Sequence, residues 1–285
     1  MSEVSYLNLL SKVLTTGSSV EDRTGVGTFQ TVIPETIVWD LAEGFPCLTT
    51  KTTFWKGAIA ELLWMCRGST NVRELSKILY NDPDKPNFWT PNYEKQAKDL
   101  GYTDGNLGPV YGAQLVSFSG VNQLLYVEQE LKNSPESRRA VISMWNPGEL
   151  RNMALPPCHY TSVFNIDSGK LHLTTLMRSN DLFLGAPFNY VFYAALLECY
   201  SVILDIPAGT YSHISVNSHV YKNQLEQVQE QISRTPSKLP KLVISEHGKE
   251  LLKRNGVVAF FDLSLDDFSL EGYEPQATLT APMAV

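Results

Sequence analysis

The apolar residues of this chain recur at helical spacing in several stretches. The first stretch is followed by Gly17, and its periodic apolar positions are Val4, Leu7, Leu10 and Val13. The same spacing predicts helices over residues 55–66 and 121–131. Residues 188–204 are apolar almost all round, which is typical of a helix buried at the centre of a domain. The sequence therefore predicts these helices, the first of them amphipathic and ended by its glycine.

Alternation of apolar and polar residues predicts strands. The runs that alternate span residues 28–40, 139–145, 159–167, 171–178 and 210–217. Asp167-Ser168-Gly169 joins two of these runs and predicts a hairpin, whereas the last run ends at Asn217-Ser218-His219. Because strands and helices are mixed without a regular βαβ alternation, we expect an α+β fold in a single domain over residues 1–285.

Composition and charge narrow the classes of function. The chain has 285 residues, of which 43% are hydrophobic and 19% charged, as in a folded globular protein. Its 23 Lys and Arg against 30 Asp and Glu give a net charge of −7, which argues against a basic surface for nucleic acid. Any phosphate must therefore be held locally. Residues 81–110, rich in Pro, Asn, Asp, Tyr and Gly, form a long irregular stretch of the kind that is usually functional or disordered.

Neither a membrane segment nor a metal site is expected. The first residues lack the basic and apolar regions of a secretion signal, and Asn189 and Glu198 interrupt the longest apolar stretch, so we expect a soluble, cytoplasmic protein. The five histidines form no i, i+4 pair with a carboxylate, which argues against a metal hydrolase. The paired spacing of a disulfide framework or zinc site is absent from the cysteines Cys47, Cys66, Cys158 and Cys199.

Cys158 is the candidate nucleophile. It follows Pro156 and Pro157, which stiffen the chain and leave no N–H to compete, as a fixed nucleophile requires. A buried structural cysteine is the alternative, because free cysteine behaves as a small hydrophobe. The adjacent His159 adds little, since neighbours on a strand point to opposite faces.

Other polar residues interrupt apolar segments. Glu61 is either a surface carboxylate on the polar stripe of its helix or a buried one whose raised pKa suits proton transfer. Arg178 and Asp181 lie at the end of an apolar strand, where an arginine can meet a phosphate or carboxylate. Trp89 alone is more typical of a core than of a cofactor platform. Two signals are weaker. Arg138-Arg139 is a basic doublet, and His219 and Tyr221 are hydrogen-bonding side chains two residues apart on one face of a strand.

Together these segments resemble the thymidylate synthase family over nearly the whole chain and in the expected order, with the phage-type members most similar. The segments that carry the resemblance are Asp22-Arg23-Thr24-Gly25-Val26-Gly27-Thr28, Phe45-Pro46 with Thr49-Thr50-Lys51, Glu61-Leu62-Leu63-Trp64, Leu107-Gly108-Pro109-Val110-Tyr111-Gly112, Ser137-Arg138-Arg139, Met153-Ala154-Leu155-Pro156-Pro157-Cys158-His159, Arg178-Ser179-Asn180-Asp181, Leu184-Gly185-Ala186-Pro187-Phe188-Asn189, His219-Val220-Tyr221 and Ala281-Pro282-Met283-Ala284-Val285.

The resemblance implies an obligate homodimer of α+β subunits, each with a mixed sheet packed with helices, that dimerises through the sheet. Each of its two sites would bind deoxyuridine monophosphate (dUMP) and 5,10-methylenetetrahydrofolate. Cys158 would attack C6 of the pyrimidine, which makes C5 nucleophilic enough to take the one-carbon unit of the folate. Tyr111 would belong to the same catalytic group.

The resemblance also assigns the residues that bind the nucleotide. His219 and Tyr221 would bond the sugar hydroxyl group. Asn189 would bond O4 and N3–H of the base, and because an amide both donates and accepts, the base should be uracil. The phosphate would be held by side chains of both subunits, namely Arg23, Arg178 and Ser179 with Arg138 and Arg139 from the neighbouring subunit.

For the folate, the resemblance implies a second group of residues. Glu61 would manage protons around O4 and the folate through ordered water, and Asp181 would bond the pterin. Val285 would close over the site, and Lys51 would meet the polyglutamate tail. Further contacts to the folate would come from Trp89, Leu184, Gly185 and Phe188.

Several positions depart from the pattern of members that make thymidylate, and they are Thr90, Leu115, Val116, Val163, Met177 and Gln224. The Met177 form resembles the pyrimidine hydroxymethylase branch, although Asn189 keeps the uracil form. Both branches form an exocyclic methylene at C5, which hydride from the folate converts to thymidylate and water converts to 5-hydroxymethyl-dUMP. We therefore expect a dUMP hydroxymethylase, with a thymidylate synthase as the alternative. A catalytically idle relative that binds RNA is disfavoured by the retained catalytic residues and by the net charge.

Overall fold

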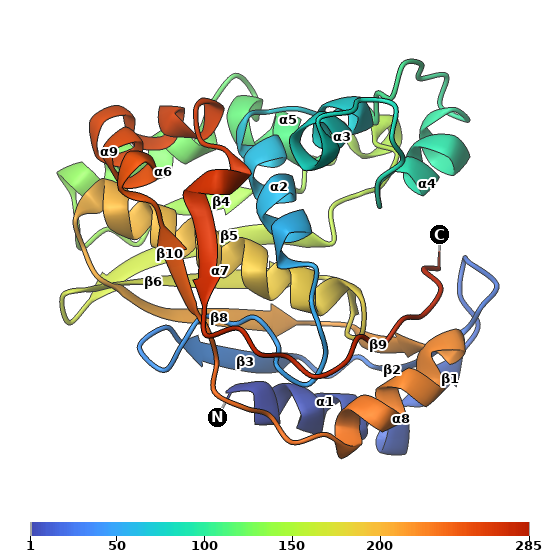
Figure 1. Cartoon of the computed structure of the whole chain (residues 1–285). Coiled ribbons are helices and arrows are strands. Elements are labelled where there is room, and N and C mark those ends of the chain that lie inside the picture. Colours follow the sequence, from blue (N-terminus) through green and yellow to red (C-terminus); the bar gives the residue numbers. More distant parts are fainter. Residues whose placement is uncertain (1, 285) are drawn as a thin grey trace.

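The computed structural model describes residues 2–284 (Figure 1). Its largest sheet has five strands in the order β3-β8-β6-β5-β4. The strands are β3 (Glu35–Asp40), β8 (Ala208–Ser215), β6 (Lys170–Met177), β5 (His159–Asp167) and β4 (Val141–Ser143). β6 and β8 run parallel and the other neighbours run antiparallel, which confirms the expected mixed sheet in an α+β fold.

The hairpin predicted at Asp167-Ser168-Gly169 is confirmed. Ser168 and Gly169 have φ angles of 51° and 73°. Positive φ at both central residues is the requirement of a type I′ turn, whose twist matches that of the flanking strands. The turn pairs Asp167 with Lys170 and so fixes the register of β5 against β6.

The strand predicted over residues 210–217 is wrong at its end. β8 ends at Ser215, and the following β9 (Ser218–Tyr221) belongs to a second sheet of order β1-β2-β9-β7. Between them the carbonyl oxygen of Asn217 accepts a hydrogen bond from Asn180 N–H, which links the chain to β7 of the second sheet. The alternation of apolar and polar residues continues through this change of sheet. The remaining strands of this second sheet are β1 (Ser18–Val20), β2 (Thr28–Thr31) and β7 (Asn180–Asp181).

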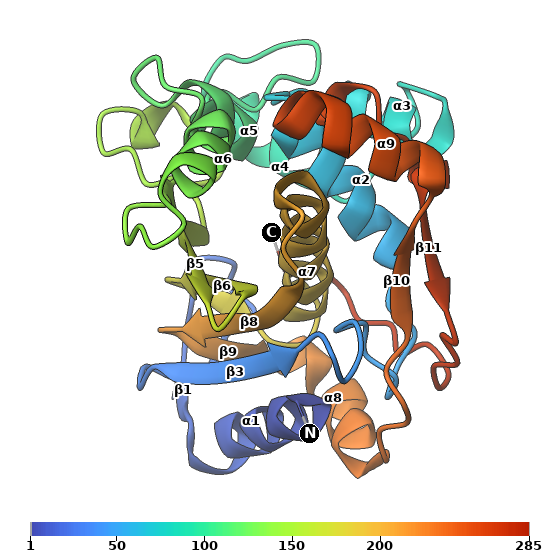
Figure 2. The same cartoon turned by 90° about the vertical axis from the view of Figure 1, so that its left-hand side faces the viewer.

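The central helix is α7 (Gly185–Leu204), which packs on α2 (Trp55–Cys66) and on β6 and β8. In Figure 2, α7 lies between the five-stranded sheet and the ribbon formed by β10 (Lys241–Ile244) and β11 (Phe268–Glu271). By length and composition α7 could cross a membrane, but 67% of its most apolar window is buried inside the protein. The prediction of a helix buried at the centre is therefore confirmed.

Other helices gather at two opposite sides of the molecule in both views (Figures 1 and 2). α1 (Ser2–Thr16) and α8 (Leu225–Ser233) lie together beside β3, and the opposite group comprises α3 (Val72–Tyr80), α5 (Tyr111–Ser117), α6 (Gln123–Asn133) and α9 (Glu246–Asn255). The stretch expected to be irregular contains α4 (Thr90–Asn92) and a π-helix (Tyr93–Ala97). Short 3₁₀ segments are Leu150–Asn152, Lys222–Gln224, Gly256–Phe261 and Leu265–Asp267.

The first helix is confirmed, but one of its predicted core positions is wrong. Leu10 and Val13 are buried, whereas Val4 is 49% exposed. Val4 and Val13 are about two and a half turns apart on a helix of 3.6 residues per turn, so they face opposite sides. Tyr6 occupies the buried side instead, where its hydroxyl group donates to the carbonyl oxygen of Leu182 over 2.9 Å.

Glu3 ties α1 to the segment that precedes α2. Its carboxylate is only 3% exposed and accepts hydrogen bonds from the backbone N–H groups of Thr49 and Thr50 over 2.8 to 3.0 Å. The hydroxyl groups of the same two threonines also donate to it, over 2.8 and 2.7 Å. A buried charge satisfied by this many donors is costly to remove, because the donors lose their acceptor inside the protein.

Replacing Glu3 with glutamine is therefore expected to lower the free energy of unfolding by roughly 3 kcal/mol, since the amide puts a donor where only acceptors fit. Chemical denaturation measures the change. The matched control is Glu250→Gln on the exposed side of α9, for which a change below about 0.5 kcal/mol is expected. Equal stability of the two variants would contradict the structural role of Glu3.

Candidate active site

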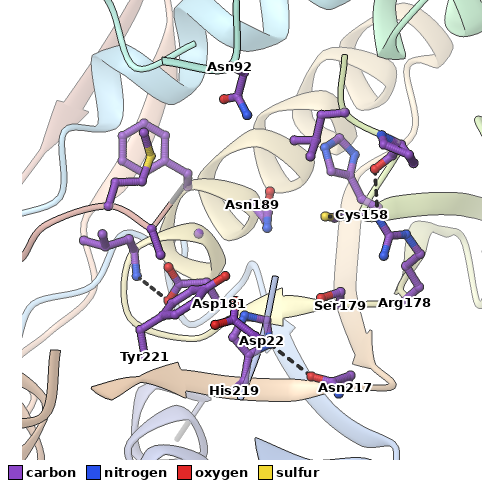
Figure 3. A pocket seen from close by; sticks show the side chains of 18 of the residues that line it. Asp22, Asn92, Cys158, Arg178, Ser179, Asp181, Asn189, Asn217, His219 and Tyr221 are labelled. Atoms are coloured by element: carbon purple, nitrogen blue, oxygen red, sulfur yellow. Dashed lines mark hydrogen bonds between the residues drawn. The ribbon is translucent and has the colours of Figure 1, made fainter. Parts of the chain in front are cut away.

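One cavity of about 760 Å³ brings together most of the residues that the sequence singled out. Residues of α2, α7, the four-stranded sheet and the segment before β5 line it. Figure 3 shows the side chains of Cys158, Asn189 and Tyr221, among others, around one shared space. The volume lies in the upper part of the range typical of small-molecule sites. The predicted site residues that line it are Arg23, Glu61, Trp89, Tyr111, Cys158, Arg178, Ser179, Asp181, Leu184, Gly185, Phe188, Asn189, His219 and Tyr221.

Cys158 lies at the end of the Pro156-Pro157 segment, one residue before β5 begins. Its backbone N–H donates to the hydroxyl oxygen of Tyr111 over 2.8 Å, and its Sγ lies 3.8 Å from Nη2 of Arg178. Burial raises the pKa of the Cys158 thiol, and the positive charge of Arg178 opposes that rise. The other three cysteines are buried in the core, whereas this thiol faces the cavity. Of the two alternatives, the structure favours a reactive cysteine.

Arg178 is held by the chain around Cys158. Its Nε and Nη2 donate to the carbonyl oxygens of Pro157 and Pro156, each over 2.8 Å, and its guanidinium lies 5.4 Å from the centre of the Trp145 ring. Arg23 also lies close enough for its charge to lower the pKa of the Cys158 thiol. Fixed guanidinium groups bind an anion with little loss of side-chain freedom. The cavity therefore has a cationic end beside the nucleophile.

The loop that carries Arg23 is folded by its neighbour Asp22. The carboxylate of Asp22 accepts a hydrogen bond of 2.9 Å from Gly27 N–H and further bonds from the hydroxyl group of Thr24. Burial of Asp22 raises its pKa, but these hydrogen bonds outweigh burial and lower the pKa overall. Gly27 has a φ of 78°, a conformation that side chains rarely adopt, so a glycine is required at this turn.

Glu61 lies buried in the wall of the cavity, not on a polar stripe of α2. It is 9% exposed, and its Oε1 accepts a hydrogen bond of 2.6 Å from Nε1 of Trp89. Burial raises the pKa of Glu61 to about 7, and the hydrogen bond from Trp89 opposes that rise. The carboxyl group can therefore gain or lose a proton near neutral pH, which suits proton transfer.

His159 is a site residue to which the sequence analysis gave too little weight. Cys158 precedes β5, so the rule that strand neighbours point to opposite faces does not apply, and both residues line the cavity. The His159 ring stacks on that of Tyr111 with centroids 4.2 Å apart, and its Nδ1 lies 2.5 Å from the hydroxyl oxygen of Tyr193. Burial lowers the pKa of His159 to about 3, so the imidazole is neutral.

Asp181 shapes the turn that leads into α7. Its Oδ1 accepts hydrogen bonds from the N–H groups of Phe183 and Leu184 over 2.9 and 3.1 Å. Its Oδ2 accepts a bond of 3.3 Å from Gln224. Asn189 follows on the first turns of α7, and Figure 3 shows its amide and the Cys158 thiol pointing toward the same space.

His219 and Tyr221 lie on β9, with ring centroids 5.2 Å apart and planes at 88°. Burial lowers the pKa of His219 and raises that of Tyr221 to about 12, so neither side chain is charged at neutral pH. The Oδ1 atom of Asn217 lies 3.0 Å from Nδ1 of His219, as the dashed line in Figure 3 marks. The predicted pair thus reaches the cavity together.

Some predicted residues are not brought into this cavity. Lys51 is 4% exposed, and its Nζ donates to the carbonyl oxygen of Phe183 over 2.5 Å. The same Nζ lies 3.5 Å from the centre of the Phe183 ring. Burial lowers the pKa of Lys51 to about 7. Arg138 and Arg139 are exposed and line a separate cavity of about 230 Å³. Val285 lies outside the described residues, so its predicted closure over the site stays a prediction.

The six departing positions lie outside the lining of the cavity. Met177 is buried in β6, the hydroxyl oxygen of Thr90 accepts a hydrogen bond of 2.9 Å from Asn87 N–H, and Gln224 is fully buried. Val163 lies on the half-exposed side of β5. Within residues 2–284, the cavity lining includes none of the six positions, which are Thr90, Leu115, Val116, Val163, Met177 and Gln224.

The cavity also contains residues that the sequence analysis did not select. Phe88 and Asn92 flank Trp89 in the irregular stretch, whose expected functional character was the available signal. Phe88 meets Phe188 edge to face with ring centroids 5.5 Å apart, which forms an aromatic wall. Other unselected lining residues are Gln30 and Asn217. Across the described part of the chain, no group of three or more His, Cys, Asp or Glu side chains could hold a metal ion.

Comparison with known proteins identifies the family. The thymidylate synthase family matches residues 4–285. Thymidylate synthase of Enterobacteria phage T4 is 40% identical over 284 residues, and a probable thymidylate synthase of Escherichia phage T5 is 41% identical over 283, each match covering 98% of this chain and 99% of the relative. The crystal structure of the T4 phage enzyme matches with a TM-score of 0.91 at 40% identity, over 98% of this chain and 99% of that one. The chain therefore belongs to the thymidylate synthase family, and its resemblance to the phage members is confirmed.

Proposed function

We propose that the protein transfers the one-carbon unit of 5,10-methylenetetrahydrofolate to C5 of dUMP and reduces it with hydride from the folate, so that the products are dTMP and dihydrofolate. The observation that carries this proposal is the Cys158 thiol in a cavity that also contains Arg178, Asn189 and Glu61. Membership of the thymidylate synthase family supports this chemistry. Because the relatives are phage proteins, the reaction would take place in the cytoplasm of an infected bacterium.

Cys158 supplies the covalent step. Its thiolate adds to C6 of uracil, a C–S bond forms, and the electron pair of the C5–C6 double bond moves toward C5 and O4. C5 would then bond to the one-carbon unit and lose its proton to water, and the bond between that unit and the folate nitrogen would break to leave a methylene group on C5. Hydride from the folate would turn the methylene into a methyl group as the thiolate leaves C6 and the C5–C6 double bond is restored. The guanidinium of Arg178, 3.8 Å from Sγ, stabilises the thiolate that must form.

The aromatic side of the cavity fits a folate. Phe88, Phe188 and Trp89 offer faces and edges for a flat ring system, and Asp181 offers a carboxylate to its N–H groups. When bound, the folate supplies the one-carbon unit and the hydride. The protein stacks and orients the ring, and Met283 and Ala284, which line the cavity, would help to exclude water.

Hydride, not water, ends the reaction in this proposal. The hydroxymethylase expectation rested on six departing positions, and none of the six lines the cavity, so none presents its side chain directly to C5. The relatives from phages T4 and T5 are both named thymidylate synthases. These observations favour the thymidylate synthase alternative over the hydroxymethylase that we expected from the sequence.

Asn189 is proposed to read the base. Its carboxamide can donate to O4 and accept from N3–H of uracil, whereas cytosine presents an amino group and an unprotonated N3. A carboxyl group that carries a proton would fit cytosine better. The specificity of the site would then depend on this one side chain.

Asn189→Asp is accordingly expected to raise the ratio of kcat/KM for dCMP to that for dUMP by roughly two orders of magnitude or more, because a mispaired polar group in a dry site is strongly rejected. Steady-state kinetics with both nucleotides measure the ratio. Asn92→Asp, which makes the same change of side chain in the same cavity, is the control and should leave the ratio unchanged. An unaltered ratio in Asn189→Asp would remove this residue as the reader of the base.

The proposal includes a homodimer formed through the five-stranded sheet. One side of β6 and β8 is buried, and the other side remains half-exposed in the single chain. That side carries Val163, Leu176 and Ile214, of which Leu176 and Ile214 pair directly. The same side also carries polar residues, among them His172, Thr174 and Thr210. A half-exposed sheet face with apolar residues among polar ones suits a second copy of the chain. Arg138 and Arg139 would then extend from each subunit to the phosphate in the other.

Hybrid dimers test the shared phosphate site. Arg139→Ala and Cys158→Ala homodimers should each be nearly inactive. After mixing and subunit exchange, half of the dimers carry one intact site, so activity should recover to about a quarter of the wild-type value. Native mass spectrometry verifies the exchange. Full exchange without recovery of activity would mean that Arg139 does not act in the neighbouring site.

Tritium release tests the proposed function as a whole. Bond formation at C5 expels the C5 hydrogen, so dUMP carrying tritium at C5 should release it to water. The release should require both 5,10-methylenetetrahydrofolate and Cys158. If tritium stays on the nucleotide with both substrates present, one-carbon transfer to C5 is not the activity of this protein.

A further inference from the structure

Two amide side chains link β2 to the histidine at the sugar end of the cavity. Gln30 on β2 lies opposite His219 on β9 in the antiparallel register, and Asn217 precedes β9 by one residue. Nδ2 of Asn217 donates to Oε1 of Gln30 over 3.0 Å. Oδ1 of Asn217 lies 3.0 Å from Nδ1 of His219 (Figure 3). All three side chains line the cavity.

The direction of this chain of hydrogen bonds determines where His219 carries its proton. The Asn217 amide has one donor end and one acceptor end, and its donor end is engaged by the oxygen of Gln30. Its acceptor end therefore faces Nδ1 of His219, which must hold the proton and donate it. The other ring nitrogen, Nε2, is left without a proton and can only accept.

The groups around His219 determine its protonation state. Burial lowers the pKa of His219, while three features oppose that effect: the carboxylate of Asp181, its neighbour on β7, a hydrogen bond to the backbone of Asn217, and the carboxylate of Asp22, in the loop before β2. The ring is therefore neutral and has a single proton to place. Because Asn217 is an amide and not a carboxylate, it orients the ring without adding a third negative charge.

We propose that Gln30 and Asn217 are positioning residues that hold His219 in its Nδ1–H tautomer, so that Nε2 accepts a hydrogen bond from the sugar hydroxyl group of the nucleotide. The hydroxyl group of Tyr221, on the ring 5.2 Å from that of His219, then donates to the same oxygen. The pair therefore selects a ligand group that both donates and accepts a hydrogen bond, such as the 3′-hydroxyl group of dUMP. The identity of the ligand rests on the proposed function, whereas the tautomer does not.

The tautomer can be measured directly in the free protein. With ¹⁵N-labelled histidine, the chemical shifts of the two ring nitrogens distinguish a protonated from an unprotonated nitrogen, and His219→Gln identifies the signals of His219 among the five histidines. The expected result is a protonated Nδ1 and an unprotonated Nε2. A protonated Nε2 in the wild-type protein would overturn the proposal, whether or not the protein acts on dUMP.

Two substitutions at Gln30 separate its role in the tautomer from any effect on folding. Gln30→Met removes the acceptor for Asn217 Nδ2, so the amide can turn over and His219 should show averaged shifts of both tautomers. Gln30→Glu keeps an oxygen at that place and should retain the wild-type pattern. Wild-type shifts in Gln30→Met would show that Gln30 does not set the tautomer.

Kinetics with 2′,3′-dideoxyuridine monophosphate connect the tautomer to the substrate. The ratio of its KM to that of dUMP reports the hydrogen bonds to the 3′-hydroxyl group. In Gln30→Met this ratio should fall roughly fivefold, the effect of one neutral hydrogen bond. An unchanged ratio alongside an altered tautomer would mean that Nε2 does not bind the sugar.

Discussion

Replacing Cys158 with serine is expected to reduce kcat by about 10⁴-fold or more, while dUMP still binds. The serine hydroxyl group has nearly the shape of the thiol but does not form an anion near neutral pH, and the neutral His159, whose pKa burial lowers to about 3, would not act as a strong base for it. The positive charge of Arg178, which favours a thiolate, would have no anion to stabilise. Single-turnover kinetics measure the loss, and calorimetry measures dUMP binding.

Cys47→Ser is the matched control. Cys47 is fully buried outside the cavity and lies beside the hydroxyl group of Tyr273, whose oxygen can accept a hydrogen bond from the new serine. We expect this variant to keep most of its activity at a small loss of stability. Turnover by Cys158→Ser comparable to that of Cys47→Ser would exclude Cys158 as the nucleophile.

The second large effect is expected at Glu61. Glu61→Gln should lower kcat by roughly 10²-fold to 10⁴-fold, because an amide does not exchange the proton that a positioned acid or base moves. The pKa of Glu61 is raised to about 7 by burial, so the wild-type pH profile should show an ionisation near pH 7. That ionisation should be absent from the profile of Glu61→Gln.

Trp89→Phe refines this test because it changes the pKa and keeps the carboxyl group. The indole N–H, 2.6 Å from Oε1, stabilises the ionised carboxylate and lowers the pKa of Glu61. Removal of this donor should raise the pKa, so the ionisation seen in the pH profile should move to higher pH. Trp55→Phe on the same helix as Glu61, outside the cavity lining, is the control and should leave the profile in place. Movement to lower pH would contradict the assignment of this ionisation to Glu61.

The sequence predicted elements well where one local pattern decides the structure. The apolar run over residues 55–66 became a helix with those bounds, and the Asp167-Ser168-Gly169 turn became the expected hairpin. The strand prediction over residues 210–217 failed at Asn217, because the alternation of apolar and polar residues continues through the bend while the chain changes sheets. Periodicity describes which side a residue faces, and it carries no signal for the sheet that a strand joins.

The chemistry of the site depended on contacts that sequence spacing does not contain. Whether Glu61 is exposed or buried could not be decided from its helix, since the answer lies in the Trp89 segment that covers it. Gln30 and Asn217 are 187 residues apart in the chain, so their hydrogen bond left no trace in the local pattern. The role of Lys51 at the folate tail stays a prediction, and no signal in the sequence indicated the contact of its ammonium group with the Phe183 carbonyl oxygen.

We expected hydroxymethylation from the types of the departing residues alone, because the sequence does not show where these residues lie in the fold. Met177 and Val163 are two of the departing positions, and the Met177 form resembles the hydroxymethylase branch. In the structure Met177 lies in β6 between His159 and Ser215, and Val163 faces the opposite, half-exposed side of the sheet. A substitution behind the wall can adjust the wall, but it does not present a water to the reacting carbon.

The most direct test of the account is to incubate the purified protein with dUMP and 5,10-methylenetetrahydrofolate and to identify both products by mass spectrometry. The nucleotide and folate products together show which species reacts with the methylene at C5. We expect dTMP and dihydrofolate in equal amounts. Formation of 5-hydroxymethyl-dUMP with tetrahydrofolate would contradict it and would identify water, held within the closed site, as the group that ends the reaction.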